Sequence, residues 1–224
     1  MKHSGTRRLF RLGLISVVSA AVIWAAISLC QMREPAYGKH LLSEWLDAYD
    51  TNLRFADEVP TRSGFTDEQI DEALNDIGEN AFPQLLRWLQ ARDSPLKLKI
   101  NSLLGGQPWI RFRFEAAIAR QCLAETGFIY YGPSAKAARP TLIQMTLSKD
   151  PNERDLGYEG FFFTRPEAHD FLPVAYRALE EPDPDTRAMA AQWTVERFPE
   201  EAEGLGLRSR FPQFYSLPDE QALE

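Results

Sequence analysis

A group of positive charges around an aromatic side chain, near the middle of the chain, is the best candidate for binding a partner. The group consists of Lys97, Lys99, Trp109, Arg111 and Arg113. Lysine and arginine donate hydrogen bonds to anionic groups, and tryptophan supplies the kind of aromatic anchor that is enriched in protein interfaces. We therefore predict a partner-binding or anion-binding surface on this stretch.

The same stretch is also compatible with a purely structural role. Leu96, Leu98, Ile100 and Leu103 are spaced like the apolar side of an amphipathic segment. In this alternative the leucines pack on neighbouring helices, and the cations pair with nearby acidic side chains. Insertions of this kind often cap a stack of helical repeats. The sequence leaves both interpretations open.

Residues that could form an active site or hold a metal ion are sparse. The histidines are His3, His40 and His169. Glu167, His169 and Asp170 are too close in sequence to converge on one ion, so we interpret His169 as part of a solvated helix surface. The chain has neither a Gly-x-Ser-x-Gly nucleophile motif nor a Gly-Lys-Ser/Thr phosphate loop. We expect no catalytic residue, no metal and no cofactor.

Adjacent carboxylates and the cysteines are interpreted as structural. The pair Glu180-Glu181 falls where a helix is expected to end, and charge at such places serves solubility and capping. Cys30 closes the hydrophobic N-terminal segment, which leaves Cys122 alone in the rest of the chain and excludes a disulfide there. Cys122 lies near alanines and a leucine at helical spacing, which predicts a small buried side chain.

The charge of the chain is unevenly distributed. The first 33 residues hold five of the 25 basic side chains and none of the 32 acidic ones, so the remaining 191 residues carry a net charge of −12. A surface this acidic repels the phosphate backbone at long range. We therefore expect a protein partner and no nucleic-acid partner.

The N-terminal region predicts a membrane segment. Residues 12–32 contain no charged side chain and are long enough to cross the hydrocarbon core as a helix. The basic residues that precede them predict a cytoplasmic N-terminus, with the rest of the chain outside the cytoplasm, which is the periplasm in a bacterium. A cleaved signal sequence is the alternative, although the apolar run is longer than signal sequences need and ends without a clear cleavage site.

An internal repeat of 33 residues is visible in the second half of the chain. Asp150-Pro151-Asn152-Glu153-Arg154 returns as Asp183-Pro184-Asp185-Thr186-Arg187, and Arg165-Pro166-Glu167 returns as Phe198-Pro199-Glu200. Each Asp-Pro turn is expected to start a first helix, capped by Asn152 or Asp185. Pro166 and Pro199 are then expected to start the second helix of each pair.

The same plan, with more variation, predicts helices earlier in the chain. They cover about residues 66–77, 83–89, 114–131 and 136–147, and the first of them begins with a capping-box pattern from Thr66 to Gln69. No segment alternates with the period of a strand. We predict an all-α fold of about four stacked helix pairs, an α-α superhelix or solenoid, because one pair cannot bury its apolar face alone.

Helix pairs that open with Asp-Pro-Asx-x-Arg resemble HEAT repeats, a class of armadillo-type helical repeats. A closer similarity is to membrane-anchored HEAT-repeat proteins of the Verrucomicrobia type. The motifs that carry it are Glu34-Pro-Ala-Tyr37-Gly38-Lys39, Leu42-Ser43-Glu44-Trp45-Leu46 and Ile77-Gly78-Glu-Asn80-Ala81-Phe-Pro83. The resemblance spans roughly residues 34–203 and implies a solenoid of the kind that serves mainly as a binding scaffold.

These observations divide the chain into four parts. They are a basic cytoplasmic tail (1–11), a transmembrane anchor (12–32), a HEAT-like helical domain (34–208) and a C-terminal tail (209–224). The function we expect is that of a non-enzymatic protein-protein interaction scaffold on the outer side of the membrane. The alternative is an enzyme, or an auxiliary subunit of one, with an anion-binding pocket near Arg111 and Arg113.

Overall fold

The computed structural model describes residues 34–54, 63–99 and 116–215. The predicted anchor, residues 12–32, lies outside these ranges, and so do Trp109, Arg111 and Arg113. Within the described ranges, no helix is both long and apolar enough to span a bilayer.

The described residues are mostly helical, which confirms the all-α prediction. The α-helices are α2 (Leu42–Arg54), α3 (Asp67–Ile77), α4 (Phe82–Leu89), α6 (Ala117–Tyr131), α7 (Arg139–Met145), α8 (Pro151–Phe163), α9 (Ala168–Leu179), α10 (Pro184–Arg197), α11 (Pro199–Gly204) and α12 (Leu207–Arg210). Short 3₁₀ helices cover Gly78–Ala81, Gly132–Ala138 and Pro212–Phe214. A small antiparallel hairpin, β1 (Ala36–Tyr37) and β2 (His40–Leu41), precedes α2 and was not predicted.

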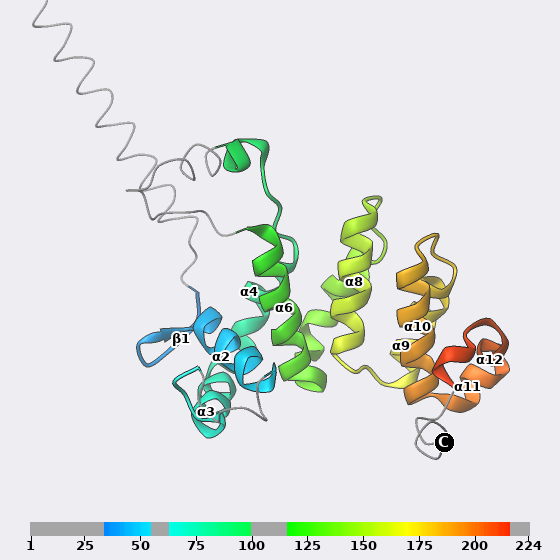
Figure 1. The fold of residues 1–224 in the computed structure, drawn as a ribbon, viewed down its shortest axis with the longest axis horizontal. Coiled ribbons are helices and arrows are strands. Elements are labelled where there is room, and N and C mark those ends of the chain that lie inside the picture. Colours follow the sequence, from blue (N-terminus) through cyan, green and yellow to red (C-terminus); the bar gives the residue numbers. More distant parts are fainter. Residues whose placement is uncertain (1–33, 55–62, 100–115, 216–224) are drawn as a thin grey trace, which may run out of the picture.

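The helices form two rows. One row runs α2, α6, α8 and α10, in which each helix contacts the next. The second row contains α3, α4, α7 and α9, which pack on α2, α6, α8 and α10 respectively. In Figure 1 the helices α6, α8 and α10 stand side by side, and α11 and α12 close the C-terminal end.

The tightest packing within the repeat differs from the predicted pairing. We expected α8 to pair with α9, the helix that follows it, but α8 packs far more extensively on α7, and α9 on α10. The Asp-Pro turns therefore join closely packed helices, while the turn between α8 and α9 joins helices that are more widely separated.

The repeated arginine has the same structural role in both turns. Arg154 Nη1 donates to the Ser148 carbonyl over 3.2 Å, and Arg187 Nη1 donates to the Glu181 carbonyl over 2.7 Å. In each case the acceptor lies six residues before the arginine. This contact ties the start of α8 or α10 to the end of the preceding helix, and it explains the arginine in the 33-residue motif.

The helix caps are the first aspartates of the motifs, which corrects the prediction for Asn152 and Asp185. The Asp150 carboxylate accepts the Asn152 amide at 3.0 Å, and the Asp183 carboxylate accepts the Thr186 amide at 2.7 Å. An aspartate before the proline has the extended backbone that a capping residue needs, whereas the Asx residue is already inside the helix.

The capping box at α3 is confirmed. The Thr66 hydroxyl accepts the Gln69 amide at 3.3 Å, and the Gln69 side chain accepts the Thr66 amide at 2.9 Å.

The prediction that a proline starts the second helix of each pair is confirmed at Pro199 and wrong at Pro166. Pro199 is the first residue of α11, but α9 begins only at Ala168, two residues after Pro166. The N-cap of α9 is Glu167, which has an extended backbone, and Arg165 just before Pro166 has a φ of 45°, in the left-handed region.

One hydrophobic core runs through both rows. Its largest fully buried side chains include Phe128, Tyr158, Phe161, Phe162 and Phe171. Phe161 and Phe162, at the end of α8, are both fully buried in this core. Trp45 and Leu46 are also buried, where α2 covers the N-terminal end of the rows.

Small residues allow the close approach of α7 and α8. A Cβ atom added at Gly157 would lie 2.7 Å from the Thr146 backbone nitrogen and 2.8 Å from Met145 Cβ. Backbone atoms cannot move aside as a flexible side chain can. A methyl group here must therefore separate the two helices.

We predict that Gly157→Ala lowers the free energy of unfolding by about 1–3 kcal/mol, the usual range for overpacking. Gly204→Ala is the matched control, because a Cβ at Gly204 meets no neighbour within 4 Å. It should change stability by less than about 0.5 kcal/mol. Urea unfolding of both variants measures the difference, and equal stability of the two would contradict the close packing of α7 and α8.

Candidate functional site

The predicted cationic surface is only partly within the described residues, and there it is neutralised. Lys97 Nζ lies 2.5 Å from Asp93 Oδ1, and the Asp93 carboxylate also accepts the Ala117 amide at 3.1 Å. The hydrogen bond from Lys97, followed by that from Ala117, holds the pKa of Asp93 below its usual value. Lys97 therefore helps to fix the start of α6.

Lys99, Leu96 and Leu98 are the other residues of this stretch for which the structure gives the exposure. Lys99 is exposed, and its predicted role in binding stays a prediction. Leu96 and Leu98 were expected to pack on neighbouring helices in the structural alternative, but they are 67% and 54% exposed. That part of the alternative is wrong for Leu96 and Leu98, while Ile100 and Leu103 lie outside the described residues.

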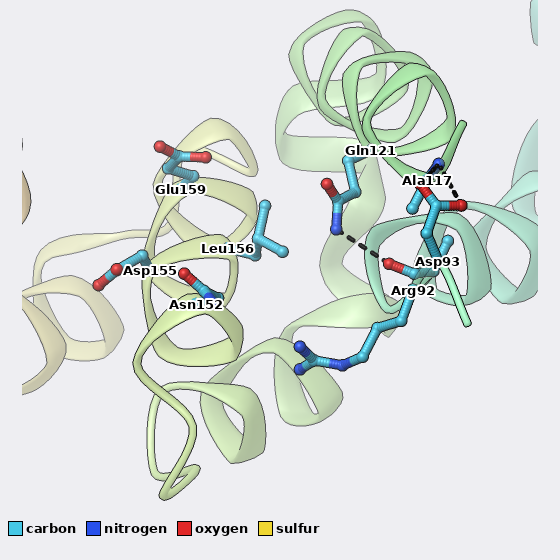
Figure 2. A pocket seen from close by; sticks show the side chains of 9 residues that line it. Arg92, Asp93, Ala117, Gln121, Asn152, Asp155, Leu156 and Glu159 are labelled. Atoms are coloured by element: carbon cyan, nitrogen blue, oxygen red, sulfur yellow. Dashed lines mark hydrogen bonds between the residues drawn. The ribbon is translucent and has the colours of Figure 1, made fainter. Parts of the chain in front are cut away.

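An open groove lies between α6 and α8. It has a volume of about 510 Å³ and is bounded by the end of α4, one side of α6 and one side of α8 (Figure 2). Its lining consists of Ala91, Arg92, Asp93, Ala117, Gln121, Asn152, Asp155, Leu156 and Glu159. Six of these nine residues are polar or charged, and Leu156 is the largest apolar one.

Helical spacing places the residues of each wall. Asn152, Leu156 and Glu159 recur at intervals of four and three along α8, so they share one side of that helix. Gln121 stands opposite on α6, and its side-chain amide donates to the Ala91 carbonyl at 3.0 Å. Figure 2 shows Leu156 and Gln121 facing each other across the groove, while Asp155 points away from it.

Two ion pairs close one end of the groove. Arg92, at the end of α4, lies 2.9 Å from Asp150 and 3.7 Å from Glu153. Arg92 thus links α4 to the first turn of α8. Acidic side chains in this turn also interact favourably with the partial positive charge at the helix N-terminus. Its charge is balanced locally and does not neutralise the carboxylates farther along the groove.

The carboxylates of Glu159 and Glu125 destabilise the folded chain when they are ionised, because they are partly buried and Glu125 repels Glu159. Burial, followed by the charges of Glu125 and Asp155, raises the pKa of Glu159 to about 7. Burial also raises the pKa of Glu125 on α6. Within the described residues, Glu159 makes no hydrogen bond or ion pair. A cationic group placed between α6 and α8 would therefore relieve both desolvation and repulsion.

The aspartate on the far side of α8 has a structural partner. The Thr186 hydroxyl donates to Asp155 over 3.0 Å and thereby connects α8 to α10. Burial is the main reason that the pKa of Asp155 is raised. Asp155 thus acts on the groove by its charge, while its side chain belongs to the contact between α8 and α10.

Sequence reasoning did not identify the groove, because its walls lie about 34 residues apart in the chain. One signal was present: Glu159 stands in an otherwise apolar run between Tyr158 and Phe161, where a charged side chain needs an explanation.

The prediction that Glu181 serves solubility and capping is also corrected. Glu181 pairs with Arg154 Nη2 at 3.1 Å and accepts the Tyr158 hydroxyl at 3.1 Å, so it holds the turn together.

Cys122 and His169 were both interpreted from the sequence as structural residues. Cys122 is exposed, so the prediction of a buried side chain is wrong. It lies on the same side of α6 as Ile118 and Ile129, which are 63% and 37% exposed. His169 is exposed at the start of α9, as predicted, with Glu167 and Asp170 at 3.6 Å and 3.3 Å.

Comparison with known proteins gave no relative. No protein-family model matches the chain, and no curated protein or solved structure matches it. The resemblance to HEAT repeats therefore stays a prediction.

We predict that Glu159→Gln stabilises the protein at high pH only. The folded chain binds this proton more tightly than the unfolded chain, so the unfolding free energy of the unaltered protein falls as pH rises from the ordinary value of 4.5 to about 7. Glutamine escapes this loss. We expect a gain of roughly 1–2 kcal/mol near pH 8, after allowance for solvent screening, and almost none near pH 4.

Urea unfolding at the two pH values measures this difference. Glu203→Gln, at an exposed position of α11, controls for the loss of one negative charge. An equal increase in unfolding free energy from both substitutions at pH 8 would show that net charge is responsible. It would contradict the claim that the groove destabilises ionised Glu159.

Proposed function

We propose that this chain is a membrane-anchored helical-repeat scaffold that binds a basic segment of a partner protein in the groove between α6 and α8. The proposal combines the predicted anchor at residues 12–32 with a HEAT-like solenoid that stands outside the cytoplasm. Two rows of helices and the repeated Asp-Pro-x-x-Arg turn support the solenoid architecture.

The observation that carries the proposal is the state of Glu159. A half-buried carboxylate that lacks a basic partner among the described residues, and that is repelled by Glu125, is destabilising in the free protein. A lysine or arginine from a partner would supply the missing charge and a hydrogen-bond donor. The free energy of that neutralisation becomes available for binding.

The surroundings of the carboxylates favour a polypeptide segment over a small ion. The groove has about 510 Å³ of space, and Asn152 is exposed at its wall. Along α6, the exposed side chains of Ile118 and Ile129 flank Glu125 at helical spacing. A segment with a basic residue between apolar ones would match this order of side chains.

The net charge of the chain also supports a protein partner with basic residues. An acidic body steers basic segments toward it and disfavours nucleic acid. In this proposal the groove needs no metal, cofactor or catalytic group. Binding would instead depend on ionised Glu159, so it would strengthen as pH rises through about 7.

We predict that the double variant Glu125→Gln/Glu159→Gln weakens partner binding at least tenfold, because it removes charge-assisted hydrogen bonds. The full-length protein, carrying an affinity tag, is recovered from membranes of its native organism with bound partners. The partner recovered in equal amount is then purified, and its dissociation constant is measured for each variant.

The double variant Glu200→Gln/Glu203→Gln is the control, since both residues are exposed on α11 and the change in net charge is the same. It should bind as the unaltered protein does. The proposal fails if the two double variants bind equally well, or if binding is as strong at pH 5.5 as at pH 8.

A further inference from the structure

Three arginines from three different elements converge on the turn between α8 and α9. Arg139 comes from α7, Arg165 lies in the turn itself, and Arg197 is the last residue of α10. Their proximity is reflected in Arg197, whose pKa is lowered first by burial and then by the positive charges of Arg165 and Arg139. Like charges gathered in this way need a reason.

Two of the arginines are fixed by the carbonyl groups of the turn. Arg139 is buried, and it donates from Nε to the Thr164 hydroxyl at 3.1 Å and from Nη2 to the Thr164 carbonyl at 3.0 Å. Arg197 Nη2 donates to the Pro166 carbonyl at 2.8 Å. The Arg197 guanidinium also lies over the Phe198 ring, 5.2 Å from its centroid. Both guanidinium groups are thus preorganised on either side of Arg165.

The third arginine is held in an unfavourable backbone conformation. Arg165 has a φ of 45°, and it is the one residue other than glycine with a positive φ in the described ranges. The equivalent position one repeat later, Phe198, has a φ of −138°. The repeat therefore does not require this conformation, and strain retained at one turn is typical of a functional site.

The positive charge at the turn is incompletely balanced. Asp170 is the carboxylate that approaches these arginines in the described residues, but its distance to Arg139 Nη1 is 3.7 Å, and it also lies 3.3 Å from His169. Arg197 Nη1 is buried and has no hydrogen-bond partner there. A buried donor without an acceptor is unusual and often marks the place of a bound group.

The start of α9 adds to the same electrostatic field. Its N-cap residue, Glu167, makes no side-chain capping bond to the first amides of this 12-residue helix, and Asp170 is the acidic residue of its first turn. The N-terminus of a helix carries a partial positive charge. The helix start and the three guanidinium groups therefore favour the same kind of ligand.

We propose that Arg139, Arg165 and Arg197 form a binding site for a small oxyanion, a phosphate or carboxylate group, at the turn between α8 and α9. Arginine forks match the geometry of both groups. Arg197 Nη1 offers the buried donor. Arg165 is exposed, and its side chain, whose Cδ lies 3.8 Å from a Cβ built at Gly132, would turn to close over the ligand. The site is separate from the groove between α6 and α8 and does not depend on it.

The test is the thermal unfolding of the full-length protein with increasing phosphate or acetate, at pH 7 and at an ionic strength held constant with chloride. A bound anion should raise the unfolding midpoint with the logarithm of its concentration once the site begins to fill, by roughly 2–4 °C at about five times the dissociation constant. Response to phosphate alone assigns a phosphate group, and response to acetate as well assigns a carboxylate-tolerant site.

Two variants and a control distinguish binding from a structural role. Arg165→Gly relieves the positive φ, so it should fold at least as well as the unaltered chain and yet lose the anion-dependent shift. Arg197→Gln should lose the shift too. Lys149→Gln, an exposed charge at the opposite turn of α8, should keep it.

The proposal is overturned if neither anion raises the midpoint, or if chloride raises it equally, since that would report ionic screening. It is also overturned if Arg165→Gly retains the full shift. In that case the arginines serve only to hold the turn.

Discussion

The contact on which the helical stack depends is the one that Arg154 and Arg187 make with the carbonyl group six residues before them. Each contact joins the start of a helix in one row to the end of a helix in the other, and each is accompanied by an aspartate cap. Because a helix pair cannot bury its apolar side alone, the angle fixed at these turns decides whether the next pair reaches the core. The close contact of Gly157 with α7 lies directly beside the first turn.

The two kinds of turn give the molecule two chemically different edges. The turns that precede α8 and α10 carry the acids Asp150, Glu153, Glu181 and Asp183, which are occupied by arginines and helix amides. The turn between α8 and α9 carries the opposite charge, from Arg139, Arg165 and Arg197. The groove lies between these edges, on the side of α6 and α8.

Local signals in the sequence were sufficient to predict much of the fold. Thr66 and Gln69 marked the start of a helix, and the Asp-Pro motifs marked two more, because caps and prolines act through neighbouring residues. The left-handed conformation of Arg165 could not be predicted. It depends on Arg139 and Arg197, which approach from other helices and hold the carbonyls on either side.

The candidate sites were harder to predict for the same reason. Lys97 looked available for a partner, but its ion pair with Asp93 depends on how the start of α6 is placed. Glu125 and Glu159 lie on different helices, and their mutual repulsion exists only after α6 and α8 pack together. Charge that is costly in the folded state is therefore a property of the fold, and it is the feature on which the binding proposal depends.

Site-specific photocrosslinking tests the binding proposal most directly. A photoreactive amino acid is placed at Asn152, which is exposed in the groove, and separately at Glu203, which is exposed on α11. The native cells are irradiated and the adducts are identified by mass spectrometry. The account predicts one dominant adduct from position 152, on a peptide that contains lysine or arginine, and none of it from position 203. No adduct at 152, or the same adduct from both positions, would contradict it.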